Sequence, residues 1–305
     1  MRNYLFGLIL LAYAGTLSAN QDSDFLAARQ AFQTGDAKRL DDYARRLQRH
    51  ALWPYVEYYQ FRMVLQTTDV ATIRNFLQRH DGSLVADRLR ADWLKTLGKN
   101  QQWQLFDAEY PLLGNKDTEL LCYYYQRRLS ASDKTALTDA RSLWSTPTSM
   151  PDSCTPIFQA LISSGQISQQ DIWTRIRAAL EEGQTSVATH VNRYLTGNDA
   201  LNSADLNNAA KNPQRYLETL KSKIKTRSDR EIVLFALLRL LRNDTNQAYV
   251  QWLKIKDQLT ASDRSYFLGR LGYRAAMRHD SRAPDWFREA QNTAQPYPPS
   301  DTVLA

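Results

Sequence analysis

Short helical periods, each interrupted by glycine or proline, constrain the fold of this 305-residue chain more than any other feature. The stretch Ser83–Tyr110 is the clearest example. Its first residue can cap a helix whose apolar residues recur at three- and four-residue steps, and Gly98 is expected at the end of that helix. A second period runs from Trp103 to Pro111, where proline should stop it. The short connection predicts two antiparallel helices whose apolar faces must be buried on neighbouring hairpins.

Much of the chain repeats this hairpin in diverged form. Glycine (11) and proline (10) are sparse and mostly separate helical periods, and no run of alternating apolar and polar residues indicates a strand. Pro213 should open a helix that reaches Ile224, and Glu231–Arg242 is apolar nearly all round, as in a buried central helix. We therefore predict an all-α fold, a superhelical α-solenoid of about sixteen short helices stacked as antiparallel hairpins.

The first nineteen residues are typical of a secretory signal. Arg2 precedes a short apolar run, and Leu17–Ala19 resembles a small-residue cleavage site. The alternative is an N-terminal anchor that remains uncut. We therefore expect a signal peptide at residues 1–19, an α-superhelical domain at 20–294, and a linker or truncated start of a further segment at 295–305. This organisation predicts a protein that is exported from the cytoplasm and does not span the membrane; the resemblance described below makes that compartment the periplasm, reached by secretion across the inner membrane.

The two cysteines, Cys122 and Cys154, are the only ones in the chain. In an oxidising compartment such a pair favours one disulfide, although two buried free thiols remain an alternative. Their spacing matches no common zinc-site pattern. A disulfide here would fasten the proline-rich stretch Ser145–Pro156, which is predicted to be a loop, to the helix that carries Cys122.

Four glutamates are the candidates for a catalytic carboxylate. Cleavage of a glycosidic bond needs a carboxylic acid, usually beside a second carboxylate, and the candidates are Glu57, Glu109, Glu181 and Glu182. We expect Glu57 to pair with Arg62 or Arg45, and the adjacent Glu181 and Glu182 to be solvated. An enzyme site on the helices is therefore the least favoured interpretation.

Other residue types give no stronger signal of chemistry. The histidines (His50, His80, His190 and His279) are isolated, and no glycine-rich phosphate loop occurs. The site prediction is therefore no catalytic, cofactor-binding or metal-binding residue, and no cofactor. Each of the seven tryptophans is expected in the core rather than on a ligand surface. The net charge of +7 fits either an ordinary solvated surface or a surface that faces an anionic polymer.

Several ordered motifs resemble one family. Leu52–Tyr58, Ser83–Leu94, the Trp103, Phe106 and Tyr110 series, the region of Cys122 to Phe158, and the stretch Gly165–Ala179 are similar to motifs of the soluble lytic murein transglycosylases. The resemblance covers roughly Phe25–Trp286 and concerns the N-terminal superhelical domain of that family. It implies a ring or horseshoe of helices and a context in peptidoglycan, where these enzymes cleave MurNAc–GlcNAc bonds to 1,6-anhydro products.

The chain departs from the family in one respect. The family's catalytic glutamate lies in a Glu-Ser pair within a lysozyme-like C-terminal domain, and this chain contains no Glu-Ser pair. The expected function is therefore a periplasmic helical scaffold domain whose catalytic partner domain is missing, with peptidoglycan glycan strands as its ligand. The alternative is a free-standing solenoid that binds a protein partner of the cell-wall machinery, or peptidoglycan without catalysis. Nucleic acid is a poor candidate, because the positive charge is diffuse.

Overall fold

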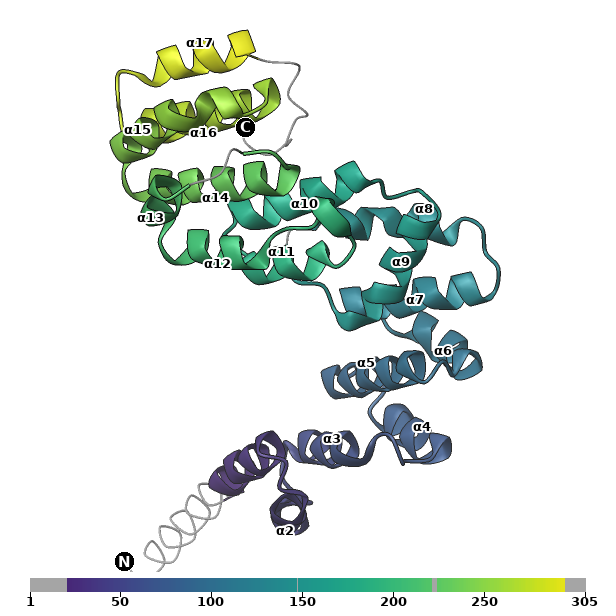
Figure 1. Ribbon diagram of the computed structural model, residues 1–305. Coiled ribbons are helices and arrows are strands. Elements are labelled where there is room, and N and C mark those ends of the chain that lie inside the picture. Colours follow the sequence, from purple (N-terminus) through teal and green to yellow (C-terminus); the bar gives the residue numbers. More distant parts are fainter. Residues whose placement is uncertain (1–20, 147, 221–223, 294–305) are drawn as a thin grey trace, which may run out of the picture. The chain divides into compact units, whose positions relative to one another are not determined.

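The computed structural model describes residues 21–146, 148–220 and 224–293, and every regular element within them is a helix (Figure 1). The all-α prediction is confirmed. The expected signal peptide and the segment 295–305 lie outside the described residues. The described chain forms two compact units, residues 21–140 with 150–159 and residues 141–149 with 160–293. The prediction of one domain at 20–294 and that of a ring or horseshoe stay predictions.

The first unit is a succession of short helices. Residues 21–33 are helical, and the following elements are α2 (Ala37–Leu47), α3 (Trp53–Val64), α4 (Val70–Arg79), α5 (Leu84–Lys99), α6 (Trp103–Glu109), η1 (Tyr110–Leu112), α7 (Thr118–Ser130), α8 (Ala136–Ala140), η3 (Asp152–Cys154) and the start of α9 (Thr155–Ser163).

Side-chain caps explain several of these helix starts. Ser83 accepts a hydrogen bond from the Ala86 amide, as predicted, and Asp69 does the same for Thr72. Pro54 lies in the first turn of α3, where its missing N–H leaves no bond unmade. The α-helix α6 ends at Glu109, before Pro111. The chain then forms the 3₁₀ turn η1, which tolerates Pro111 because a residue in the first turn needs no N–H donor.

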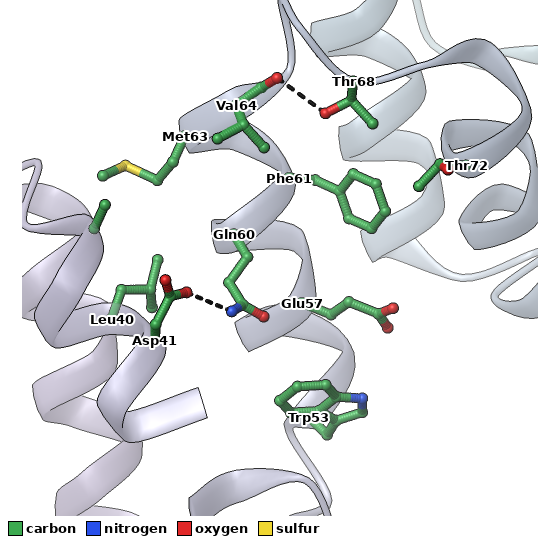
Figure 2. Close-up of a pocket in the computed structure, with 11 residues that line it drawn as sticks. Leu40, Asp41, Trp53, Glu57, Gln60, Phe61, Met63, Val64, Thr68 and Thr72 are labelled. Atoms are coloured by element: carbon green, nitrogen blue, oxygen red, sulfur yellow. Dashed lines mark hydrogen bonds between the residues drawn. The ribbon is translucent and has the colours of Figure 1, made fainter. Parts of the chain in front are cut away.

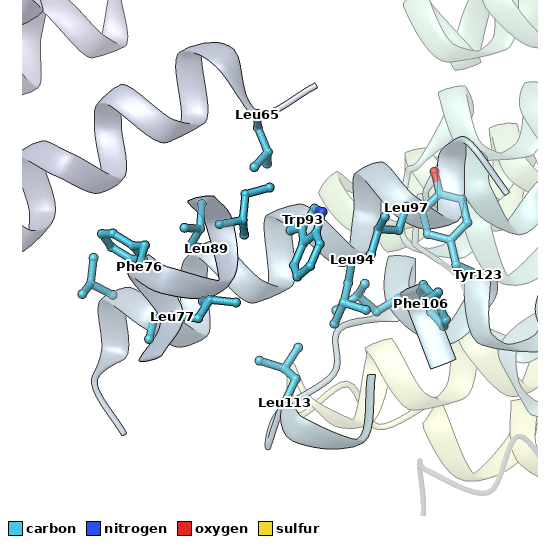
Figure 3. Close-up of a cluster of buried hydrophobic side chains, with 14 residues drawn as sticks. Leu65, Phe76, Leu77, Leu89, Trp93, Leu94, Leu97, Phe106, Leu113 and Tyr123 are labelled. Carbon is cyan, nitrogen blue, oxygen red and sulfur yellow. The ribbon is translucent and has the colours of Figure 1, made fainter. Parts of the chain in front are cut away.

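The core of the first unit lies along α5. Its buried face contributes Leu89, Trp93, Leu94 and Leu97, each no more than 3% exposed, and α4, α6 and α7 pack against that face (Figure 3). The three- and four-residue spacing in the sequence therefore predicted the buried face of this helix correctly. The apolar residues lie on one side because successive turns of a helix bring these positions together.

Gly98 differs from its predicted role. It does not end α5, which continues to Lys99, and its backbone is not in the left-handed region. A Cβ atom at this position would lie 2.4 Å from Cγ of Tyr123 on α7. The glycine is therefore required for the close approach of α5 and α7, while Gln101 adopts the positive φ at the turn.

The second unit contains longer helices. Its elements are η2 (Arg141–Ser145), α10 (Gln169–Glu181), α11 (Thr185–Asn192), η4 (Gly197–Asp199), α12 (Ser203–Lys211), α13 (Pro213–Glu218), α14 (Arg227–Asn243), α15 (Thr245–Ile255), η5 (Lys256–Gln258), α16 (Ala261–Ala276) and α17 (Ala283–Thr293). The helix predicted from Pro213 to Ile224 ends early, at Glu218. The predicted loop Ser145–Pro156 is also shorter than expected, because η3 forms within it and α9 begins at Thr155.

Neighbouring helices along the chain supply most of the packing in each unit. In the first unit α2 contacts α3, and α5 contacts α4, α6 and α7. In the second, α14 contacts α13, α15 and α16, and α16 also packs against α17 (Figure 1). Contacts to the next helix and the next but one are typical of stacked hairpins. Among the described helices, none combines the length and apolar character that crossing a bilayer requires.

Candidate functional site

A cavity of about 480 Å³ opens between α2, α3 and the start of α4 in the first unit. Its wall is mainly apolar, with Leu40, Phe61, Met63 and Val64, and Trp53 stands at one end (Figure 2). Polar groups are few. A cavity with an aromatic ring and a small number of fixed polar atoms is the usual form of a site for an organic ligand.

The polar groups of this cavity are fixed by hydrogen bonds. Nε2 of Gln60 donates to Oδ1 of Asp41 at 2.7 Å, which joins α3 to α2. The hydroxyl of Thr68 donates to the carbonyl of Val64 at 2.9 Å, at the turn between α3 and α4. Figure 2 shows both bonds at the edge of the cavity. The carboxylate of Asp41 and the hydroxyl oxygen of Thr68 keep lone pairs that can accept from a ligand without rearrangement of the wall.

Trp53 lines the cavity and also packs against the core cluster of α2 and α3. Five of the seven are buried, at no more than 3% exposure, and Trp103 packs against the core along α5. Trp53 is only partly buried and lines the cavity.

Glu57 lies on the wall of this cavity, but its predicted partners are wrong. Its carboxylate accepts from the guanidinium of Arg79 on α4, with Nη1 at 3.2 Å, and Nε2 of His80 lies 3.2 Å away. Arg62 pairs instead with Asp92, and Arg45 with Asp42. The expectation that Glu57 is held in a salt bridge is correct. The partner comes from the next helix, α4, and spacing along one helix cannot reveal a contact of this kind.

Glu109 is a structural carboxylate. It is 4% exposed, Nε of Arg74 donates to it at 3.0 Å, and Nε of Arg90 lies 3.5 Å from its second oxygen. These contacts join the end of α6 to α4 and α5. Burial of one carboxylate between two guanidinium groups is stable only because both are present.

Glu181 was expected in solvent with Glu182, and for Glu181 this is wrong. Its carboxylate accepts from the hydroxyl of Tyr266 and from the guanidinium of Arg270, both on α16. Only Glu182 is exposed. The two neighbours differ because they point to different sides of the end of α10, and one of those sides is covered by α16.

A buried ion cluster in the second unit was not found from the sequence. Arg177 on α10 donates twice to Glu231 on α14 and once to Asp263 on α16, each at 2.8 Å. Glu231 is 1% exposed. Burial alone would lower the pKa of Arg177, but the two carboxylates outweigh it and raise that pKa above its ordinary value. The only sequence signal was a glutamate at the start of the strongly apolar run 231–242.

The histidines lie apart in the structure. His50 contacts Asp22, and His80 ends α4 beside Glu57. His190 contacts Arg193, and His279 has a positive φ of 56° after α16. Over the described residues, no group of three or more histidine, cysteine, aspartate or glutamate side chains has the arrangement of a metal site.

A ladder of tyrosines forms a second aromatic surface in the first unit. The rings of Tyr110 and Tyr124 stack in parallel with centroids 4.8 Å apart, and Tyr125 continues the series at 5.6 Å. Lys116 lies 5.1 Å from the Tyr110 ring, and Arg128 is within 6 Å of the other two. Burial and the neighbouring tyrosines raise the pKa of Tyr110 to about 12, so the phenol of Tyr110 stays a neutral hydrogen-bonding group near neutral pH.

The predicted disulfide is present. Cys122 on α7 and Cys154 at the end of η3 are joined, with Cα atoms 4.9 Å apart. Two hydrogen bonds lie beside it. Nε2 of Gln126 donates to the carbonyl of Ser153 at 2.7 Å, and the hydroxyl of Ser153 donates to the carbonyl of Glu119 at 3.3 Å. The segment before α9 is therefore fastened to α7 by a covalent bond and by polar contacts.

Sequence comparison shows which named proteins the chain is similar to. No protein-family model matches it. The soluble lytic murein transglycosylase of Escherichia coli K12 is 24% identical over 250 residues, and the enzyme of the same name from Salmonella typhimurium LT2 is 23% identical over 271. The chain is therefore similar in sequence to soluble lytic murein transglycosylases over most of its own length. The similar region is 79% and 86% of this chain but only 38% and 41% of the two relatives, so the chain spans less than half of their length.

Solved structures of lytic transglycosylases share the fold. An inactive mutant of the enzyme from Pseudomonas aeruginosa superimposes with a TM-score of 0.58 at 24% identity, over 88% of this chain and 44% of that one. The 70-kDa soluble lytic transglycosylase of Escherichia coli gives 0.54 at 21% identity, over 91% and 46%. The resemblance stated from the sequence motifs is thus confirmed, and the all-helical arrangement is a lytic transglycosylase fold.

Proposed function

We propose that the chain is the helical scaffold portion of a periplasmic lytic murein transglycosylase, and that it holds peptidoglycan strands rather than cutting them. The observation that carries this proposal is the similarity to murein transglycosylases over 79% of the chain. Cleavage of MurNAc–GlcNAc bonds would then require the lysozyme-like domain with its Glu-Ser pair. The carboxylates considered for catalysis support the proposal, because Glu57, Glu109 and Glu181 are engaged by arginines that join helices.

The cavity at Trp53 is the favoured contact for the glycan. The face of a pyranose ring that carries its C–H bonds is apolar and packs on an aromatic ring, while its hydroxyls need acceptors nearby. Trp53 provides the ring, and Asp41 and Gln60 provide the polar atoms. The tyrosine ladder offers a second aromatic surface, and Lys116 beside it can attract the carboxylates of stem peptides. Arg128 is already paired with Asp133 and Asp139.

The test is a pull-down of the full chain, purified after export to the periplasm, on peptidoglycan sacculi, with released muropeptides assayed in the same tube. We expect binding without release of 1,6-anhydro products. Trp53→Ala should weaken binding by about two- to tenfold, the usual loss for one aromatic contact. The matched control is Tyr273→Ala, which removes a 43% exposed aromatic ring in the second unit and should bind normally.

Each other outcome has a definite meaning. Release of anhydro-muropeptides by the chain alone would show an active site on the helices. Failure to bind sacculi would move the assignment to the alternative, a periplasmic solenoid that binds a protein partner. Recovery of a mature N-terminus at Asn20 would establish the predicted signal cleavage, and an uncut N-terminus would contradict it.

A further inference from the structure

A second cavity, of about 510 Å³, is chemically unlike the one at Trp53. It lies in the second unit between α12, α13 and the start of α14. Carboxylates of Asp205 and Asp229 line it, and so do the cationic side chains of Lys211 and Arg215. The two signs are therefore balanced at two negative and two positive groups. Leu220 and Ile224 supply a small apolar part of the wall.

The polar groups of this cavity are largely uncommitted. Within the part of the chain that the structure describes, no hydrogen bond or ion pair engages the side chains of Asp205, Asn208, Lys211 and Arg215, or the hydroxyl of Tyr216. Asp229 is the exception, because one of its oxygens caps α14 by accepting from the amides of Lys225 and Thr226. Asp205 and Tyr216 are partly buried, whereas Asn208, Lys211 and Arg215 are exposed at the mouth of the cavity.

Tyr216 lines the same cavity as the two acidic groups. Burial raises the pKa of its hydroxyl, and the nearby Asp205 and Asp229 raise it further. The hydroxyl is thus a neutral donor and acceptor beside two carboxylates. A ligand ammonium placed there could donate to the carboxylates and to the phenol oxygen, and three N–H groups match three acceptors.

We propose that this cavity binds the end of a short peptide that carries both a free ammonium and a free carboxylate. The ammonium would lie at Asp205, Asp229 and Tyr216, and the carboxylate at Lys211 and Arg215. A purely anionic or purely cationic ligand would be attracted by one pair of charges and repelled by the other, whereas a zwitterion can pair with both. The proposal rests on the proposed function for the source of the peptide, because peptidoglycan stem peptides carry amines and carboxylates together.

The experiment is isothermal titration calorimetry of the full chain with a stem tripeptide that ends in diaminopimelate. Three further probes are the same peptide with acetylated amines, the same peptide with amidated carboxylates, and an N-acetylated disaccharide without peptide. We expect the unmodified peptide to bind, and each blocked form to bind about tenfold or more weakly, because each loses charge-assisted hydrogen bonds. The disaccharide should neither bind at this cavity nor compete.

Substitutions at the cavity test whether the peptide binds there. Asp205→Asn and Lys211→Gln should each weaken the unmodified peptide by about tenfold. The matched controls are Asp257→Asn and Lys134→Gln, which remove the same charges at exposed positions elsewhere and should leave the affinity unchanged. Equal binding of the amine-blocked peptide, competition by the disaccharide, or normal binding by Asp205→Asn would each overturn the proposal.

The sacculus pull-down separates this proposal from the proposed function. If the unaltered chain binds sacculi but shows no heat with the tripeptide, the zwitterion site is refuted and the scaffold function stands. If the tripeptide binds and intact sacculi do not, the site is real and the scaffold function fails.

Discussion

At the scale of single residues, Gly98 has a structural role that its residue type did not predict. Glycine late in a helical period usually ends the helix, yet here it lets α5 and α7 approach closely at Tyr123. The contact belongs to a residue 25 positions further along the chain. Sequence periodicity describes one helix at a time, and so it has no information about which residue of another helix will cover a given face.

The first prediction concerns this contact. Gly98→Ala should lower the free energy of unfolding by about 1–3 kcal/mol, because the added methyl group overlaps the Tyr123 ring in a packed core. Gly269→Ala is the control, since it lies inside α16 with nothing within 4 Å of the added atom. That change should be neutral or stabilising by up to about 1 kcal/mol, from helix propensity alone. Urea unfolding measures both, and an equal effect of the two substitutions would disprove the steric role of Gly98.

The second prediction concerns Glu231. Glu231→Gln should destabilise the second unit by about 3–5 kcal/mol, because Arg177 and Arg227 would keep their buried charges without this partner. Glu289→Gln, at an exposed position of α17, should change stability by less than about 0.5 kcal/mol. Chemical unfolding followed by tryptophan fluorescence is the measurement. A loss below 1 kcal/mol for Glu231→Gln would mean that the cluster is not important for stability.

At the scale of elements, α7 carries more constraints than its length suggests. It packs on α5, presents Tyr124 and Tyr125 to the tyrosine ladder, and holds the disulfide to Cys154. The disulfide and the hydrogen bonds beside it hold α7 in a fixed position against the segment before α9. The disulfide and the ladder therefore depend on one element.

The third prediction follows from the disulfide. Its two cysteines are 32 residues apart, so reduction should lower the free energy of unfolding by about 3–4 kcal/mol in the chain-entropy account. The measurement is urea unfolding with and without reductant. The double variant with Cys122→Ser and Cys154→Ser should behave like the reduced chain and should not respond to reductant. A reductant effect in that variant would show that the loss has another origin.

The fourth prediction concerns the aspartates that begin helices. Hydrogen bonds from Thr72 lower the pKa of Asp69 in α4, and bonds from Ser168 lower that of Asp171 in α10. A pKa that is lower in the folded state means that the unfolded chain binds more protons in acid. These groups therefore stabilise the fold above about pH 4, the ordinary value for aspartate, and their contribution is lost as pH falls through the lower folded values.

The measurement is the thermal midpoint between pH 7 and pH 2. It should be nearly constant from pH 7 to 5 and then fall below about pH 4. Asp69→Asn keeps an acceptor at the cap but removes the titrating group, so its midpoint should fall less steeply in acid. An identical acid profile for this variant would exclude Asp69 as a contributor.

At the scale of the whole chain, the fold class was accessible from sequence and the site was not. Helix positions, the buried face of α5 and the cysteine pair follow from local spacing and composition, which act over a few residues. The partners of Glu57, the ion cluster at Glu231 and the pairing of Glu181 each join different helices. Those contacts depend on how hairpins stack, and no single-helix pattern encodes that.

The candidate sites show the same division. The aromatic residues near Trp53 and the tyrosine run at 123–125 were visible as unusual composition, so an aromatic surface could be anticipated. The cavity between α12, α13 and α14 could not, because its six-residue helix α13 was expected to be longer and its polar residues are unremarkable along the sequence. Three helices bring these side chains around one space.

The contacts between neighbouring helices also bear on how the chain acquires its structure. Low separation along the sequence keeps the entropy of loop closure small, and proteins rich in such contacts fold quickly. Each hairpin can form before the next has been synthesised. During synthesis, most contacts of a hairpin therefore need only residues that have already emerged. The same locality implies that end helices can open while inner ones remain closed, and amide hydrogen exchange should therefore be graded along the chain rather than uniform.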